Sequence, residues 1–319
     1  MNRGPIGTTL TVNGSSISGR GTFLDPGRLP DRKEVRIRKY LPFESRARLH
    51  ALVSELAKRS MSYQQIQTQI FDSTRIWLSK GSISGWVRGI HNPTGGKNTF
   101  CAVASPELAY VIGVIAGDGN LNVHGYNYEM LLSVTDRDFA EEFSRCLAKI
   151  LSRRNPYRVR RSEKRNRWIV QGSSVLLYQF LNRPWQNLKS FLEHCEECTA
   201  AFLKAFYDGE GCISGRLLRL DNTQADILLY IQGLLRKLGI ETTDLNRRKL
   251  AGTELIDPLN GRIYVRNKDC FDFRIRARSL SQFEQKVGFT ITRKQQRLAN
   301  ALATRPRFHP SPSANRLIV

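Results

Sequence analysis

Two apolar segments that each end in a Gly-acid-Gly turn are the feature of this sequence that most limits its fold. LAYVIGVIAGDGNL spans residues 108–121, and TAAFLKAFYDGEGCI spans residues 199–213. Each segment has the length and composition of a buried helix, and the turns carry Asp118 and Glu210. A single such turn is an ordinary helix end, because Gly and Asp are common there. Two matched copies indicate a duplicated unit in which the two acids have equivalent places.

Small residues at matching positions predict how the two helices meet. Gly113 and Gly117 are four residues apart in the first segment, and Ala205 and Gly209 repeat that spacing in the second. Such a stripe lets two helices cross closely, which would bring their carboxyl ends and the two acids side by side. Adjacent carboxylates repel each other unless a cation lies between them. Hard carboxylate oxygens suit Mg²⁺ or Mn²⁺, so the sequence predicts a metal site that can activate water for hydrolysis.

Strand and helix patterns follow the two segments in a similar order. The first segment is followed by an alternating strand pattern at 126–134, a helix at 139–151 and a basic hairpin at 156–171. The second is followed by a strand at 216–223, a helix at 226–240 and a further strand at 271–278. The chain is therefore expected to contain two related units, each built from helices and strands.

Arginines gather in two of these segments. The alternation over 271–278 predicts one apolar face and one face with Arg274, Arg276 and Arg278, for which we expect no matching acids. Guanidinium groups in such a row fork onto phosphates or read guanine edges. The hairpin adds four further candidates for DNA contacts, namely Arg158, Arg160, Arg165 and Arg167. The alternative for the strand is an ordinary solvated face.

The charge of the chain favours a polyanion as its partner. Fifty Lys and Arg residues against 28 Asp and Glu residues give a formal net charge of +22. Phosphates neutralised by such residues release condensed counterions, which favours binding to nucleic acid. A ribosome-associated or merely basic protein is the alternative. No apolar run reaches about 18 residues, and the N-terminus lacks a signal-peptide core, so we expect no membrane partner and a cytoplasmic (nucleoid) or organelle-interior location rather than secretion.

A helical pattern precedes the duplicated region. Leu49, Val53 and Leu56 indicate an amphipathic helix, Ser62 with Gln65 fits a capping box, and residues 79–93 indicate a third helix. We expect Ile83, Trp86 and Val87 to pack inward and Ser82, Ser84 and Arg88 to face outward. This arrangement is similar to a helix-turn-helix, whose last helix would enter a major groove. A small helical bundle with no role in DNA binding is the alternative.

The patterns divide the chain into six expected segments. They are a flexible basic segment (1–40), the helical domain (41–93), a linker (94–105), a first unit (106–195), a second unit (196–302) and a flexible tail (303–319).

The paired motifs resemble the LAGLIDADG homing endonucleases. Val111–Gly119 (VIGVIAGDG) and Leu203–Gly211 (LKAFYDGEG) align without gaps with the nine-residue family motif. The resemblance implies an α+β fold with two αββαββα units related by a pseudo-twofold axis, the motif helices at their interface and saddle-shaped sheets that sit on DNA. It also implies that Asp118 and Glu210, with the carbonyls of Gly117 and Gly209, hold the metal ions.

The resemblance also implies two assisting lysines. A Lys often follows the last helix of each unit, and Lys189 and Lys294 are the candidates here. A solvated lysine without a role in the site is the alternative, and it is more favoured for Lys189 than for Lys294. A charged amine near the scissile phosphate would stabilise the transition state. The sequence departs from the family motif at its sixth position, where the first copy has Ala116 and the second has Asp208. That position looks structural in the family, so Ala116 need not abolish activity.

Cysteines give weaker signals. His194, Cys195 and Cys198 include a CxxC spacing, but no second pair completes a common zinc motif. The sequence therefore favours helix-surface thiols or a stabilising disulfide over a zinc site. Six cysteines in so long a chain do not form a disulfide scaffold.

The leading functional hypothesis is a monomeric, intron-encoded DNA endonuclease that makes a site-specific double-strand cut. An RNA maturase that binds intron RNA, or a DNA-binding regulator that uses the same fold without cleavage, are the alternatives. An intein is disfavoured because the sequence lacks the Cys or Ser start and the His-Asn end of protein splicing.

Overall fold

The computed structural model describes residues 41–94, 100–124, 127–256 and 261–303 of the chain. The expected basic segment 1–40, nearly all of the expected tail 303–319 and part of the expected linker 94–105 lie outside the described residues.

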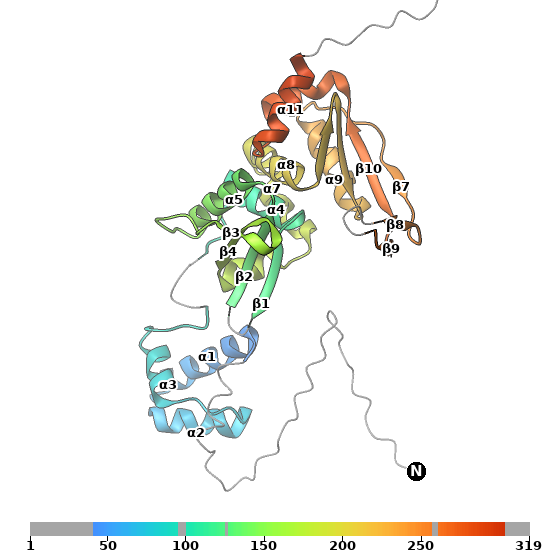
Figure 1. Cartoon of the computed structure of the whole chain (residues 1–319). Helices are drawn as coiled ribbons and strands as arrows, with labels where there is room; N and C mark the ends of the chain where they lie inside the picture. Colours follow the sequence, from blue (N-terminus) through green and yellow to red (C-terminus); the bar gives the residue numbers. More distant parts are fainter. Residues whose placement is uncertain (1–40, 95–99, 125–126, 257–260, 304–319) are drawn as a thin grey trace, which may run out of the picture.

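Two units with the same order of elements make up most of the molecule (Figure 1). The first contains α4 (Pro106–Ala116), β1 (Asn120–His124), β2 (Asn127–Val134), α5 (Arg137–Ile150), β3 (Arg160–Ser162), β4 (Arg167–Ser173), α6 (Val175–Leu181) and α7 (Lys189–Leu192). The second contains α8 (Glu196–Glu210), β5 (Gly211–Ser214), β6 (Leu217–Asn222), α9 (Ala225–Lys237), β7 (Asn246–Lys249), β10 (Cys270–Ile275), α10 (Leu280–Lys286) and α11 (Thr292–Ala303). The predicted α+β fold with two αββαββα units is confirmed.

The two antiparallel sheets have equivalent strand orders. The first sheet has the order β1-β2-β4-β3, and the second has the order β5-β6-β10-β7. The second unit also carries a separate two-stranded sheet, β8 (Glu254–Ile256) paired with β9 (Ile263–Val265), between β7 and β10 in the chain. Apart from this insertion, the second unit repeats the topology of the first.

One hydrophobic core runs through both units. Phe139, Phe143 and Leu147 lie on one face of α5 and are buried together with Met130 and Leu132 of β2. The spacing of four residues along α5 and of two along β2 explains why a helix and a strand pack here. The same core includes residues of α4, α8 and α9. Figure 1 shows α4 and α8 at the junction of the two units, so the motif helices connect the halves.

Three helices precede the first unit and have a core of their own. They are α1 (Phe43–Lys58), α2 (Tyr63–Thr74) and α3 (Lys80–Val87). The expected capping box at Ser62 is present, because its hydroxyl accepts from the Gln65 amide and the Gln65 side chain accepts from the Ser62 amide. This helical module touches the first sheet where the Phe43 amide donates to the Tyr128 hydroxyl at 3.0 Å.

The structure corrects two expectations about side-chain direction. Val87 does not pack inward: it is the last residue of α3 and is exposed, since the chain leaves the helix through Gly89 at φ +68°. The strand expected over 271–278 ends at Ile275, and a 3-10 turn begins at Ala277. Arg276 and Arg278 therefore do not extend a strand face with Arg274.

Candidate active site

Close contact between α4 and α8 depends on a glycine. A Cβ atom placed on Gly113 would lie 2.6 Å from the backbone oxygen of Phe202 and 2.9 Å from Cβ of Ala205. Both distances are shorter than a carbon atom allows, so only glycine fits at this position. The small residues that the sequence analysis singled out thus lie where the two helices come closest.

The crossing brings Asp118 and Glu210 into the same place. A Cβ on Gly209 would lie 3.2 Å from Oδ2 of Asp118, and a Cβ on Gly117 would lie 3.7 Å from Cγ of Glu210. Each acid therefore lies against the glycine that precedes the other acid. This reciprocal arrangement follows from the duplicated motif, in which the acid always comes directly after the small residue.

The surroundings raise the pKa of both acids. Burial, followed by the charge of Asp118, raises the pKa of Glu210 to about 7. Burial also raises the pKa of Asp118, although its side chain still reaches solvent, while the charges of Lys294 and Arg167 act in the opposite direction. The Asn222 side chain donates to Oε1 of Glu210 at 3.1 Å and favours its charged form. Two neighbouring acids whose proton affinity is raised by burial are suited to share a cation, which would offset the charge of both.

The donor set fits a hard divalent cation. Carboxylate oxygens from two helix ends converge, and the carbonyls of Gly117 and Gly209 directly precede them. Helix carboxyl ends also carry unpaired carbonyl oxygens and a partial negative charge. Mg²⁺ and Mn²⁺ prefer such oxygen ligands.

Lys294 lies beside this site, but its amine is fully engaged by backbone. It is buried in α11, and Nζ donates to the carbonyls of Tyr207, Asp208 and Gly211 at 3.2, 2.5 and 2.7 Å. These bonds satisfy carbonyl groups at the end of α8, close to Glu210. Lys294 acts electrostatically on the two acids while it holds the end of the motif helix.

Lys189, the other candidate lysine, has different surroundings. Its Nζ lies 5.2 Å from the ring centre of Trp185 and 5.0 Å from that of Tyr230, and the side chain is exposed. The segment around it forms a 3-10 turn and the one-turn helix α7, not a long helix such as α11. The structure therefore gives Lys294 and Lys189 unequal positions in the two halves.

The residue at the sixth motif position also differs between the two halves. Asp208 is buried and accepts hydrogen bonds from the backbone amides of Thr290 and Ile291 at 3.0–3.1 Å, which ties α8 to the start of α11. Burial raises the pKa of Asp208 to about 6 despite these bonds. The first half has Ala116 at this position and lacks a carboxylate to make such a tie.

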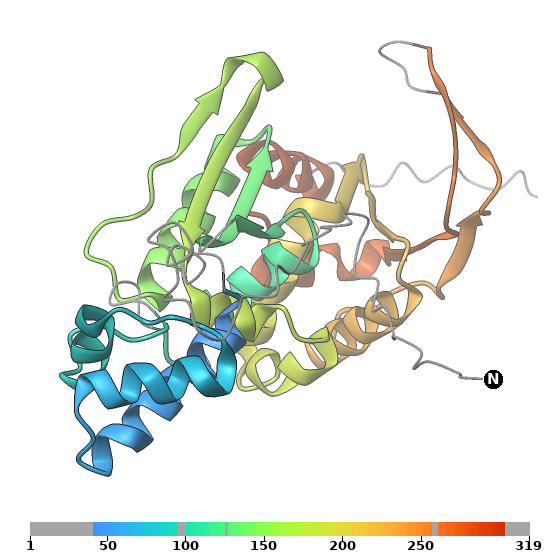
Figure 2. The same cartoon turned by 90° about the horizontal axis from the view of Figure 1, so that it is seen from below.

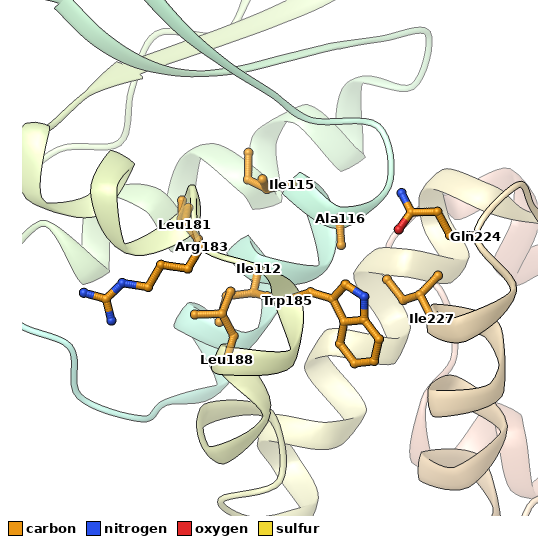
Figure 3. A pocket seen from close by; sticks show the side chains of 9 residues that line it. All are labelled: Ile112, Ile115, Ala116, Leu181, Arg183, Trp185, Leu188, Gln224 and Ile227. Carbon is orange, nitrogen blue, oxygen red and sulfur yellow. The ribbon is translucent and has the colours of Figure 1, made fainter. Parts of the chain in front are cut away.

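A cavity lies beside Ala116 in the first half. It has a volume of about 230 Å³, and Figure 3 shows side chains of α4, the α6–α7 region and α9 around it. Its lining is mostly apolar, and it includes Ile112, Ala116, Leu181, Trp185 and Ile227. The lining also includes Arg183 and Gln224, but none of its described residues is a carboxylate that could hold a metal ion, so we place the candidate chemistry at the two acids rather than in this cavity.

Basic side chains lie on arms that extend from both sheets. Arg158, Arg160, Arg165 and Arg167 are exposed in the β3–β4 region. The Arg160 guanidinium donates to Gln171, and that of Arg167 donates to the Ser133 carbonyl. Figure 2 shows this arm and the β7–β9 arm of the second unit projecting toward the same side of the molecule.

The second sheet offers a different arginine set from the one expected. Arg274 is exposed on β10, but Arg276 and Arg278 both pair with Glu241, so the expectation that no acids match them was wrong. The basic run Arg247–Lys249 on β7 is a further group that was not predicted, although Arg247 pairs with Asp269 and Arg248 pairs with Asp221. A run of three cations in a short strand was the signal that could have revealed it.

Comparison with known proteins decides the family. A model of a LAGLIDADG-like domain matches residues 197–288. Uncharacterized protein MJ0398 of Methanocaldococcus jannaschii is 33% identical over 253 residues, which are 78% of this chain and 91% of that protein. Uncharacterized protein MJ0314 of the same organism is 32% identical over 147 residues, which are 43% of this chain and 56% of that protein. The chain belongs to the LAGLIDADG family.

Solved structures with a similar course of the chain include two kinds of protein. One is the homing endonuclease I-DmoI in complex with DNA and Mn, which is 20% identical to this LAGLIDADG chain. The match covers 58% of this chain and 97% of that chain, with a TM-score of 0.43. The other is full-length DUF199/WhiA from Thermatoga maritima, which is 14% identical. The match covers 64% of this chain and 62% of that chain, with a TM-score of 0.40. Within the described part of the LAGLIDADG chain, no helix combines the length and apolar character needed to span a membrane.

Proposed function

We propose that this LAGLIDADG protein is a site-specific endonuclease that hydrolyses one phosphodiester bond in each strand of double-stranded DNA. The observation that supports it most directly is the reciprocal placement of Asp118 and Glu210 at the crossing of α4 and α8. Both halves lie in one chain, so a monomer would suffice to address both strands.

Binding would begin with the basic arms. The exposed arginines of the β3–β4 arm and the Arg247–Lys249 run of β7 carry positive charge to the same side of the molecule (Figure 2). Phosphate contacts would fix the register of the duplex, and contacts with base edges in the grooves would select the sequence. Arg88 at the end of α3 is exposed and would let the helical module extend the contact.

The acids would work at the centre of this surface. Asp118 and Glu210, with the carbonyls of Gly117 and Gly209, would hold Mg²⁺ or Mn²⁺. A bound divalent cation supplies Lewis acidity for the attack of water and for the leaving oxygen. Asn222 orients the Glu210 carboxylate, and Lys294 keeps the end of α8 in place while its charge favours the ionised acids.

The halves would contribute unequally to the cut. Asp208 and Lys294 fasten the end of α8 to α11, whereas Ala116 and the exposed Lys189 leave the end of α4 without these two ties. Preorganised groups lower the barrier more than mobile ones. We therefore expect two strand cuts with different rates.

A cleavage experiment tests the proposal. The full chain is incubated with Mg²⁺ and a plasmid library of random inserts, and the ends of the fragments are mapped. Asp118→Asn and Glu210→Gln are expected to remove cleavage but to retain DNA binding, while Asp72→Asn, an exposed acid on α2, should cleave as the unaltered protein does. Retained cleavage in both site variants contradicts the mechanism.

Other outcomes favour the other functions. Tight binding to intron RNA without nicking of DNA in Mg²⁺ would favour a maturase. A sequence-specific DNA footprint without nicking would favour a regulator.

A further inference from the structure

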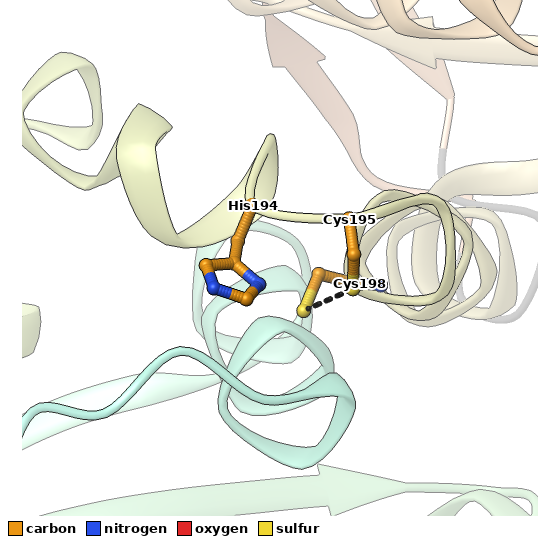
Figure 4. A group of neighbouring side chains, drawn as sticks. All are labelled: His194, Cys195 and Cys198. Carbon is orange, nitrogen blue, oxygen red and sulfur yellow. Dashed lines mark hydrogen bonds between the residues drawn. The ribbon is translucent and has the colours of Figure 1, made fainter.

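Three metal-ligating side chains meet at the amino end of α8, far along the helix from the acids. One ligand atom each from His194, Cys195 and Cys198 can be chosen so that all three lie within 4.8 Å of one another. Figure 4 shows the imidazole of His194 beside the two thiols. This cluster takes no part in the proposed cleavage and is therefore independent of it.

The local fold explains why the three groups converge. Cys195 is the N-cap residue of α8, and its Sγ accepts from the Cys198 amide at 3.3 Å. Residues three apart lie on one face of a helix, so the two sulfur atoms come to 3.2 Å from each other. His194 directly precedes the cap, where the extended backbone places its ring near both thiols (Figure 4).

The chemistry of the cluster suits a soft, tetrahedral ion. Two thiolates and one imidazole are common ligands of Zn²⁺, and Zn–S bonds of about 2.3 Å place two sulfur atoms about 3.8 Å apart in a tetrahedron. The observed separation of 3.2 Å therefore needs only a small adjustment of the side chains.

We propose that His194, Cys195 and Cys198 form a zinc site that fastens the junction between the two units to the start of α8. The fourth ligand would be a water molecule. The ion would fix the amino end of the helix whose carboxyl end carries Glu210. It would serve as a structural clamp.

Because Cys198 is buried, a metal ion bound to its sulfur would stabilise the fold at the start of α8. The Cys198 side chain is buried, and its Sγ atom lies 3.2 Å from that of Cys195. A coordinating metal displaces the thiol proton outright, so the buried sulfur would gain a strong partner in place of a weak hydrogen bond. A disulfide between the two cysteines would instead require an oxidant, and it would leave His194 without a role.

Cobalt provides a direct probe because tetrahedral thiolate sites give it an intense sulfur-to-metal absorption band. The reduced full-length protein is titrated with Co²⁺, and the bound Co²⁺ is then displaced with Zn²⁺. We expect one thiolate-bound Co²⁺ per chain, displaced stoichiometrically by Zn²⁺. An oxygen site at Asp118 and Glu210 would not give this band, so the two sites are distinguishable.

Three variants and a control locate the site. Cys195→Ser and Cys198→Ser should lose the band, and His194→Ala, an exposed change that spares the core, should bind at least about tenfold more weakly. Cys212→Ser removes an exposed thiol of β5 and should leave the titration unchanged. Absence of the band in the reduced, folded protein overturns the proposal, as does an equal response of Cys212→Ser and Cys198→Ser.

Discussion

The raised pKa of Glu210 means that its ionised carboxylate should lower the stability of the metal-free protein. Its pKa is about 7 in the folded protein, above the usual 4.5, because of burial and of Asp118. The folded state therefore binds more protons than the unfolded chain between these values, so stability falls as pH rises through this window. At pH 8 and with a chelator present, Glu210→Gln should be more stable by roughly 1–3 kcal/mol, a range reduced for solvent screening.

The measurement is urea unfolding of both proteins at pH 8 and pH 5. Most of the advantage of Glu210→Gln should disappear at pH 5, where the folded protein already carries a protonated Glu210. An advantage of the same size at both pH values would mean that the carboxylate charge is not its source.

The two candidate lysines should differ strongly in their effect on stability. Lys294→Met deprives three carbonyls of their donor and leaves Asp208 with less positive charge nearby, so it should cost about 2–4 kcal/mol. Lys189→Met removes an exposed cation from two aromatic rings and should cost about 0.5–1 kcal/mol. Equal losses in urea unfolding would show that the carbonyl bonds of Lys294 contribute little.

At the scale of elements, the crossing of α4 and α8 is the contact on which the two halves depend. Gly113→Ala would place a methyl group 2.6 Å from the Phe202 oxygen, so the helices must separate, at a cost of about 1–3 kcal/mol. Gly233→Ala in α9 meets nothing within 4 Å and should stabilise the protein by about 0.5–1 kcal/mol. Thermal unfolding of both variants checks this, and a neutral Gly113→Ala would contradict the close crossing.

The elements that could be predicted are those whose pattern is local. The apolar run of α4 and the alternation of β2 carry their periodicity within one segment, so both appeared where the sequence indicated. The end of β10 could not be predicted, because the Arg276 amide bonds to the carbonyl of Glu241, a residue distant in the sequence. Glu241 also pairs with Arg276 and Arg278, so the alternating pattern of these arginines wrongly predicted a strand face without matching acids.

The candidate site was predictable in its acids but not in their support. The duplicated motif identified Asp118 and Glu210, because the same residue type recurs at the same place in both copies. The contact of Asn222 with Glu210 depends on how β5 pairs with β6, which no local pattern reveals. The sequence favoured Lys294 over Lys189 as the assisting lysine, but only the tertiary structure shows that the Lys294 amine is buried against backbone carbonyls and that Lys189 is exposed.

At the scale of the whole molecule, the effect of the excess positive charge on DNA binding depends on where the charged side chains lie. The net charge of +22 is spread over many surfaces, and several cations are engaged by acids on the helices, as Lys149 is by Glu107 and Lys237 by Glu193. The arginines of the β3–β4 arm have few acids near them in the sequence, with Glu163 the single acid between residues 158 and 167. DNA affinity should therefore depend on the arms much more than on total charge.

Two variants of equal charge test this distribution. Arg160→Gln, Arg165→Gln and Arg167→Gln together remove three charges from the β3–β4 arm, and Lys149→Gln, Lys237→Gln and Lys286→Gln remove three from α5, α9 and α10. The slope of log affinity against log salt decreases in magnitude by about 0.9 for each lost phosphate contact. The slope of the arm variant should therefore be smaller in magnitude by up to about 2.7. The helix variant should keep the slope of the unaltered protein. Fluorescence anisotropy with one duplex at several salt concentrations measures both, and equal slopes for the two variants would mean that the arm does not bind the phosphates.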